Sequence, residues 1–240
     1  MGAILTMSLL SGLSTPVGAL IVTTTPRFGP RLLAAMLGLA SGVMAVVTVL
    51  DLFPLAWREG GPVTAVLGLL LGAAGMWTLH GLVVGTGTAD EQGRFRMMGW
   101  FVAAAMALHD LPEGMAIGAG SVVGVRVGAL LALAIALHNV PEGMSIAAPL
   151  RMGHVASRRI LLATSLIGFV TPAGTALALG VGAFSPGSSA VILALAAGAM
   201  TYVVGHDTLP ASVRASGPAA LLGLAAGVAL MLVVHIGFRM

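Results

Sequence analysis

Residues 107–117 read ALHDLPEGMAI, and residues 136–146 read ALHNVPEGMSI, so one apolar motif with His and Glu occurs twice. The chain around both copies is 58% hydrophobic and only 8% charged over 240 residues. A soluble domain has about 25% charged residues, so most of this surface cannot face water. In lipid only helices and closed barrels satisfy the backbone, and 5% aromatic residues without long alternating runs argue against a barrel.

Gly, Pro and Arg residues divide the chain into eight apolar stretches, each long enough to cross a bilayer with about 20 residues. We therefore predict an all-α polytopic membrane protein with one transmembrane domain over 1–240. The predicted segments are 2–24, 32–57, 62–85, 97–121, 125–149, 159–184, 188–213 and 217–238. The first lacks a basic region and a clear cleavage site, which favours a retained helix over a signal peptide. We expect the polar connection 86–96 to be a mobile loop.

Matches at one common offset of 156 residues indicate an internal repeat. Thr15-Pro16-x-Gly18 recurs as Thr171-Pro172-x-Gly174. In addition, Gly42, Met44, Asp51 and Pro54 recur as Gly198, Met200, Asp207 and Pro210. Five crossings separate the two starts, so 1–85 and 159–238 should run in opposite directions, with the motif pair 97–149 between them. Such a 3+2+3 inverted repeat is typical of secondary transporters.

The basic residues are all Arg and are distributed unevenly between the two ends of the predicted segments. The connections after the odd-numbered segments hold Arg27, Arg31, Arg94, Arg96, Arg151, Arg158, Arg159 and Arg214. The other side holds Arg58, Arg126 and Arg239. Cytoplasmic loops accumulate basic residues, so we expect both termini outside the cytoplasm of a cell (inner) membrane. No basic run indicates a nucleic-acid partner, and the absence of Cys excludes disulfides and thiolate metal ligands.

Ionisable residues inside a membrane are costly, and they are functional by default. Those within the predicted segments are Asp51, His80, His109, Asp110, Glu113, His138, Glu142, His206, Asp207 and His235. His109 and Glu113 are one helical turn apart, as are His138 and Glu142. Pro112 and Pro141 should kink the two helices, and Gly114 and Gly143 should let them approach so that the ligands converge.

Imidazole and carboxylate together suit zinc and neighbouring first-row divalent ions better than magnesium or calcium. These residues therefore predict a divalent-metal site near the middle of a transporter-like bundle. Metal binding requires deprotonated ligands, so we expect the affinity to rise with pH.

The two HxxPEG motifs, the ASGVM stretch at 40–44 and the eight segments closely resemble the ZIP (ZRT/IRT-like) family of metal-ion transporters. The resemblance implies import of divalent metal toward the cytoplasm, with zinc as the first substrate and Cd2+, Fe2+ or Mn2+ as others, and no cofactor or catalytic residue. It implies a transport site formed by His109, Asp110, Glu113, His138, Asn139 and Glu142. Met44 is an implied additional ligand, and His206 and Asp207 are an implied exit-side pair.

The chain departs from the family pattern at two places. Asp110 and Asn139 are exchanged relative to the usual order, which keeps the number of carboxylates. Thr171 precedes Pro172 where members with a two-ion site carry Glu, which predicts a single tightly held ion.

Some of these residues also have simpler structural interpretations. His80 and His235 are typical of hydrogen bonds between membrane helices. Met44 is open between ligand and packing roles, Asp51 between function and solvation, and Met200 is expected in the core.

Two other activities are alternatives to metal import by a carrier. An intramembrane metalloprotease needs HExxH, which neither motif matches, whereas a passive channel would share the same ligands. The expected partners are divalent metal ions and the lipid bilayer, and a homodimer is left open.

The arginine asymmetry can be tested by cysteine labelling, because the native chain has no Cys. A Cys introduced at position 157 should react with a membrane-impermeant maleimide only from the cytoplasmic side, and one at position 188 only from outside. Labelling in the reverse sense would contradict the topology and the direction of import that it implies.

Overall fold

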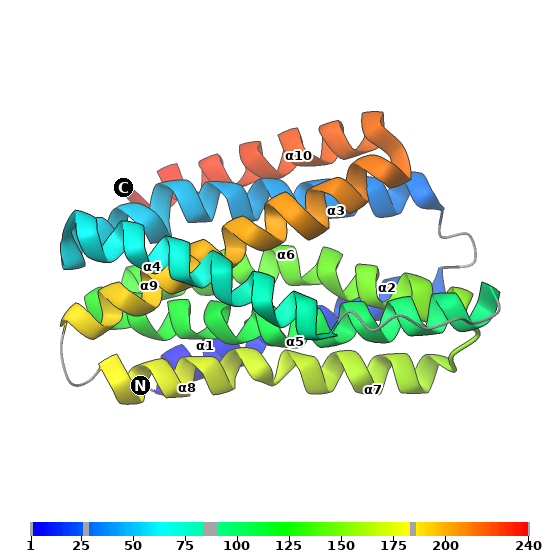
Figure 1. Ribbon diagram of the computed structural model, residues 1–240, viewed down its shortest axis with the longest axis horizontal. Helices are drawn as coiled ribbons and strands as arrows, with labels where there is room; N and C mark the ends of the chain where they lie inside the picture. Colours follow the sequence, from blue (N-terminus) through cyan, green and yellow to red (C-terminus); the bar gives the residue numbers. More distant parts are fainter. Residues whose placement is uncertain (1, 26–28, 84–90, 183–185, 240) are drawn as a thin grey trace.

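The computed structural model describes residues 2–25, 29–83, 91–182 and 186–239 (Figure 1). The side chains of some helical residues, including His80 and His109, lie outside this description. All regular structure in the described ranges is helical. The elements are α1 (Gly2–Gly12), α2 (Ser14–Thr24), α3 (Pro30–Val46), η1 (Val47–Leu52), α4 (Phe53–Val83), α5 (Glu91–Val123), α6 (Val125–Met152), α7 (Ser157–Gly168), α8 (Val170–Gly182), α9 (Pro186–Tyr202), η2 (Val203–Thr208) and α10 (Leu209–Arg239).

Five helical stretches of the described residues are long and apolar enough to cross a membrane. They are Gly2–Thr24, Pro30–Thr78, Val125–Met152, Ser157–Gly180 and Gly187–Ile236. The second and fifth span 49 and 50 residues, more than twice the about 20 that one crossing needs. Gly61 in α4 (φ 76°) and Ser216 in α10 (φ −169°, ψ 106°) interrupt the helical conformation, and the chain turns back there (Figure 1). The fold is that of an all-α, multi-pass membrane protein.

The helix boundaries follow the predicted segments with three differences. The first and sixth segments are each broken, at Leu13 and at Phe169, where ψ is −6° and −13°. The second and seventh each contain a six-residue π-helical turn, η1 and η2. The expected loop 86–96 is wrong in its second half, because α5 already begins at Glu91; residues 86–90 lie outside the described ranges.

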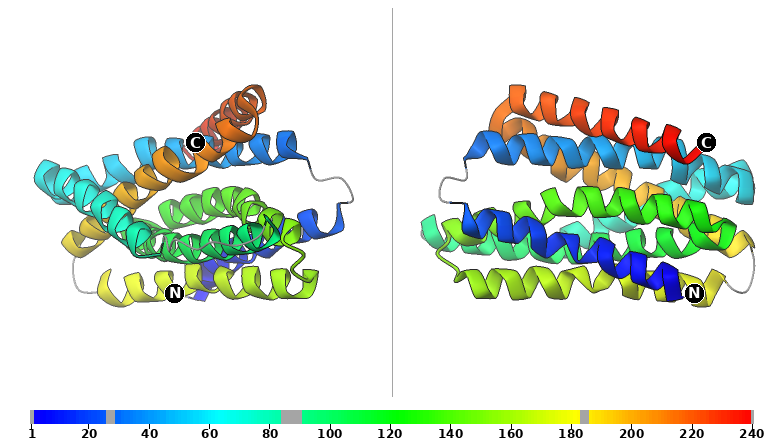
Figure 2. Two further views of the ribbon diagram at one scale, coloured as in Figure 1. Left: turned by 45° about the vertical axis from the view of Figure 1, so that its right-hand side comes forward. Right: turned by 180° about the vertical axis from the view of Figure 1, so that it is seen from behind.

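The helices form two packed groups (Figures 1 and 2). In one group α3 lies along α10 and α4 along α9. In the other, α5 packs on α6 and α8, and α6 packs on α2. The groups meet mainly where α3 contacts α6 and α5 contacts α9. Both chain ends lie at the same end of the bundle (Figure 2).

Small residues allow the close contacts within the first group. A Cβ at Gly42 of α3 would overlap the carbonyl oxygen of Leu224 in α10. A Cβ at Gly72 of α4 would overlap the carbonyl oxygen of Leu195 in α9. Lipid provides no hydrophobic force between helices, so such close backbone packing carries much of their association.

The side chain of Arg151 joins two helices at one end of the second group. The guanidinium of Arg151, in the last turn of α6, donates to the carbonyl oxygens of Val22 and Thr25. These oxygens belong to the C-terminal end of α2, where helical carbonyls lack intrahelical partners. Arg151 therefore ties the ends of α2 and α6 together.

Two glycines of α4 provide a matched test of this packing. Gly72→Ala should destabilise the protein by about 2 kcal/mol, because the added methyl group meets the α9 backbone. Gly75→Ala, three residues later, meets nothing within 4 Å and should be neutral or slightly stabilising. Thermal unfolding of both purified variants checks this, and equal melting temperatures would contradict the packing.

Candidate metal centre

The two HxxPEG motifs lie on α5 and α6, which pack against each other. Glu113 of α5 and His138 and Glu142 of α6 each offer one ligand atom, and these atoms lie within 4.8 Å of one another. The three residues are at most 1% exposed. Two carboxylates and an imidazole thus converge inside an apolar bundle, which is a donor set suited to a first-row divalent ion.

A direct contact joins the two helices at this cluster. His138 Nε2 lies 2.8 Å from Glu113 Oε1, and both side chains are fully buried. Glu142 lies one turn after His138 on α6, so both residues share a helix face. The contact holds the imidazole in place beside both carboxylates.

Asp110 and Asn139 each follow a motif histidine in the sequence and are also buried. The converging group of His, Asp and Glu side chains among the described residues does not include Asp110. Asp110 is 1% exposed and Asn139 is fully buried. Asn139 Nδ2 donates to the carbonyl oxygen of Ser11, 3.2 Å away, at the break between α1 and α2. Asn139 Oδ1 has no hydrogen-bond partner among the described residues, so an oxygen ligand is available there. His109 lies on α5, but its side chain is outside the described part of the structure.

Ser11 was not singled out in the sequence. The Gly-Leu-Ser sequence at 12–14 could have indicated the helix break beside Ser11, because Gly and Ser weaken a helix interior. The helix does break there, between α1 and α2.

Met44 is fully buried on α3, in an apolar cluster that also contains Ile135 of α6 and Met200. Met200 therefore lies in the core, as expected. The helix of Met44 packs on the helix of His138 and Glu142. Its role as an additional ligand stays a prediction.

His206 and Asp207 lie on η2, apart from the buried cluster. His206 Nδ1 is 2.8 Å from Asp207 Oδ1, and the His206 ring stacks on Tyr202. The His206 side chain is 53% exposed and that of Asp207 is 23% exposed. Asp207 lines a cavity of about 380 Å³ together with residues of α3, α5, α6 and α10, including Pro149 and Arg214. The exit role of this pair stays a prediction.

The motif glycines have different partners from those expected. A Cβ at Gly114 would overlap the carbonyl oxygen of Thr171 in α8, and one at Gly143 would overlap that of Thr15 in α2. The expectation that these glycines pack α5 directly against α6 is therefore wrong. Each instead seats its helix on one of the broken helices. Thr175 of α8 reinforces this contact by donating its Oγ1 hydrogen to the Gly114 carbonyl oxygen, 2.8 Å away.

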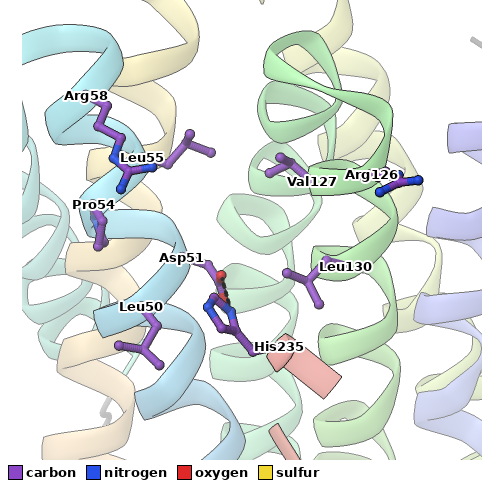
Figure 3. Close-up of a pocket in the computed structure, with 9 residues that line it drawn as sticks. All are labelled: Leu50, Asp51, Pro54, Leu55, Arg58, Arg126, Val127, Leu130 and His235. Atoms are coloured by element: carbon purple, nitrogen blue, oxygen red, sulfur yellow. Dashed lines mark ion pairs between the residues drawn. The ribbon is translucent and has the colours of Figure 1, made fainter. Parts of the chain in front are cut away.

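A third His–carboxylate pair lies elsewhere in the bundle. His235 Nδ1 of α10 is 2.9 Å from Asp51 Oδ1 of η1 (Figure 3). His235 therefore contacts another helical element, as expected, but through an ion pair with a carboxylate. The Asp51 side chain is only 9% exposed, so solvation does not account for it. The side chain of His80 lies outside the described part of the chain.

Known proteins are similar to this chain in sequence over most of its length. A family model described as ZIP zinc transporter matches residues 85–235. The zinc transporter ZupT of Corynebacterium aurimucosum is 30% identical, over 94% of this chain and 93% of its own length. The zinc transporter ZIPB of Bordetella bronchiseptica is 32% identical over 91% and 76%. The zinc transporter ZTP29 of Arabidopsis thaliana is 33% identical over 85% and 82%. With both HxxPEG motifs and their buried ligands in the matched region, the chain belongs to the ZIP family of zinc transporters, whose members are transporters and not enzymes.

Proposed function

We propose that this protein imports divalent metal ions toward the cytoplasm, with Zn2+ as its first substrate and Cd2+, Fe2+ and Mn2+ as further ones. The ion binds at Glu113, His138 and Glu142, and it is cargo rather than a resident cofactor. The observation that carries the proposal is the approach of these three buried ligand atoms to within 4.8 Å. The zinc transporters to which the chain is similar support the choice of metal.

Charge favours a divalent cation at this point. Two ionised carboxylates without compensation are costly to bury. One divalent ion offsets both charges of Glu113 and Glu142, and His138 adds a neutral nitrogen ligand. Three protein ligands leave at least one coordination position for water or a further ligand, which suits an ion that must also be released.

The arrangement in the membrane is part of the proposal. We take the fold as eight crossings in a 3+2+3 inverted repeat, with both termini outside an inner membrane. Three features support it. The helix breaks at Leu13 and Phe169 and the π-helical turns at 47–52 and 203–208 are separated by the same 156-residue offset as the sequence matches. In the repeat α3 corresponds to α9 and α4 to α10, so the contact of α3 with α10 is equivalent to that of α9 with α4, and both contacts are present. The position of both termini at one end fits an even number of crossings (Figure 2).

The two helix groups suggest how the ion moves. Glu113, His138 and Glu142 belong to the group of α1, α2 and α5–α8, whereas α3, α4, α9 and α10 form the other. A cavity of about 430 Å³ is lined by Asp51 and by Leu130 near the start of α6. Another, of about 380 Å³, is lined by Asp207 and by Pro149 near the end of α6. Movement of one group against the other would expose the site to each cavity in turn. Rocking and sliding both remain compatible with this arrangement.

Thr171 supports a stoichiometry of one ion. It is fully buried, and its backbone carbonyl packs on Gly114, next to the ligand Glu113. Its Oγ1 has no hydrogen-bond partner among the described residues. A hydroxyl brings no charge, so the carboxylates of the cluster are those of Glu113 and Glu142. One divalent ion balances their two negative charges, and a second would leave an excess positive charge in the bundle.

Two alternatives are weaker. The metalloprotease activity lacks both the HExxH motif and any support from the family. A passive channel would use the same ligands, and it differs from a carrier in that its flux does not saturate at low metal concentration.

Uptake by the purified protein in liposomes tests the function. The native chain should transport zinc with saturation, and Glu113→Ala or Glu142→Ala should reduce the rate at least about tenfold, because each removes a charged ligand. Glu59→Ala, an exposed acid on α4, is the matched control and should keep the native rate; His80→Ala should also transport. Unchanged transport by the double variant lacking Glu113 and Glu142 would refute the site, and flux that rises linearly with zinc would favour the channel.

The number of ions is tested at position 171. Thr171→Glu should raise the number of tightly bound zinc ions from one to two, because it adds a carboxylate beside Glu113. Thr171→Gln introduces a side chain of nearly the same shape as Glu without the charge, and it should keep one tightly bound ion. Equilibrium dialysis of the purified proteins measures both. Two equally tight ions in the native chain, or no gain with Thr171→Glu, would show the single-ion proposal to be wrong.

A further inference from the structure

The Asp51–His235 pair is an ionisable contact that the transport site does not use. It joins η1 to α10, and its side chains are 9% and 10% exposed. Both residues line a cavity of about 430 Å³, whose wall also contains Leu50 and Leu55 on one side and Leu130 of α6 on the other (Figure 3). An imidazole nitrogen and a carboxylate oxygen therefore face a space large enough for a hydrated ion.

The Asp51–His235 pair lies toward the end of the bundle that holds both chain termini. His235 lies five residues before the C-terminal residue, and the C-terminus shares one end of the bundle with the N-terminus. That end is the outside in the proposed orientation. Leu130, in the cavity wall, precedes His138 by eight residues of α6, which is about 12 Å along a helix. The cavity therefore lies on the outer side of the buried ligands and close to them.

The internal repeat gives Asp51 a counterpart. Asp51 in η1 matches Asp207 in η2 at the 156-residue offset, and each carboxylate contacts a His ring nitrogen, at 2.9 Å and 2.8 Å. π-Helical turns within α-helices occur frequently at functional sites. Each of the two cavities is thus lined by the acid of a His–Asp pair on a π-helical turn.

We infer that Asp51 and His235 form an outer capture site for the transported divalent cation, with Asp51 Oδ1 and His235 Nδ1 as ligands and water completing the shell. Two bonds of about 2.0 Å at a tetrahedral angle place their ligand atoms about 3.3 Å apart. The observed 2.9 Å therefore has to open by only a few tenths of an ångström. The direction of capture rests on the proposed function, whereas metal binding by the pair does not.

The surrounding charges make this a weak site. Arg58 of α4 and Arg126 of α6 line the same cavity, and Arg58 lies seven residues beyond Asp51, about 10 Å along the helix. Two positive charges repel a divalent cation at this range. With only two protein ligands, the ion is held loosely enough to move on toward Glu113 and Glu142.

Zinc titration of the purified protein tests the inference. The native chain should bind one tight ion and one weak ion. Asp51→Asn and His235→Gln should lose the weak ion, keep the tight ion, and raise the KM for uptake several-fold with little change in maximal rate. Glu59→Gln, beside Arg58 on α4, is the matched control and should keep both ions. Arg58→Gln should bind the weak ion several-fold more tightly.

The outcomes separate this inference from the proposed function. Native stoichiometry and KM in Asp51→Asn, with only a lower melting temperature, would show an interhelical ion pair and overturn the capture site. If Asp51→Asn does not fold, unchanged weak binding in Arg58→Gln would overturn it instead. Loss of the weak ion alone in Asp51→Asn, together with a retained tight ion in Glu113→Gln and Glu142→Gln, would contradict the transport site but not the capture site.

Discussion

Glu113 and Glu142 bring two carboxylates to one point inside an apolar bundle, and their desolvation and mutual repulsion have to be offset. His138 contacts Glu113 directly at 2.8 Å, and a divalent ion would offset the charges of both carboxylates. The three side chains belong to two helices, so they stay together only while α5 and α6 hold their relative position. The broken helices provide that support: α8 lies against Gly114, and α2 lies against Gly143.

Support of this kind depends on backbone contact rather than on large side chains. Thr171 and Thr15 each present a carbonyl oxygen to a motif glycine, and they are equivalent positions in the two repeats. The same small-residue packing occurs between α3 and α10, where Gly42 approaches Leu224. A bundle with many such contacts can have tightly packed groups and still leave a looser boundary between them, along which movement is easiest.

The sequence predicted the all-helical membrane fold and the ends of most segments, because apolar length is a strong signal. It also predicted that Glu113, His138 and Glu142 lie together, because ionisable residues in lipid are rare and need partners. It did not predict the π-helical turns, although Pro54 and Pro210 each follow an Asp by three residues and remove a backbone donor there. The sequence also did not predict the backbone contacts of Gly114 and Gly143 or the Asp51–His235 contact. These contacts join residues far apart in the chain, and only tertiary packing determines them. The sequence predicts a loop at Glu91 because the residues around it are polar, although α5 begins there.

The central claim is that one divalent ion binds between Glu113, His138 and Glu142. Anomalous diffraction at the zinc absorption edge, from crystals of the native protein grown with zinc, tests it most directly. The account predicts the strongest anomalous peak about 2 Å from His138 and from a carboxylate oxygen of both Glu113 and Glu142. A zinc-saturated crystal with no peak among these three side chains, and its strongest peak elsewhere, would contradict it.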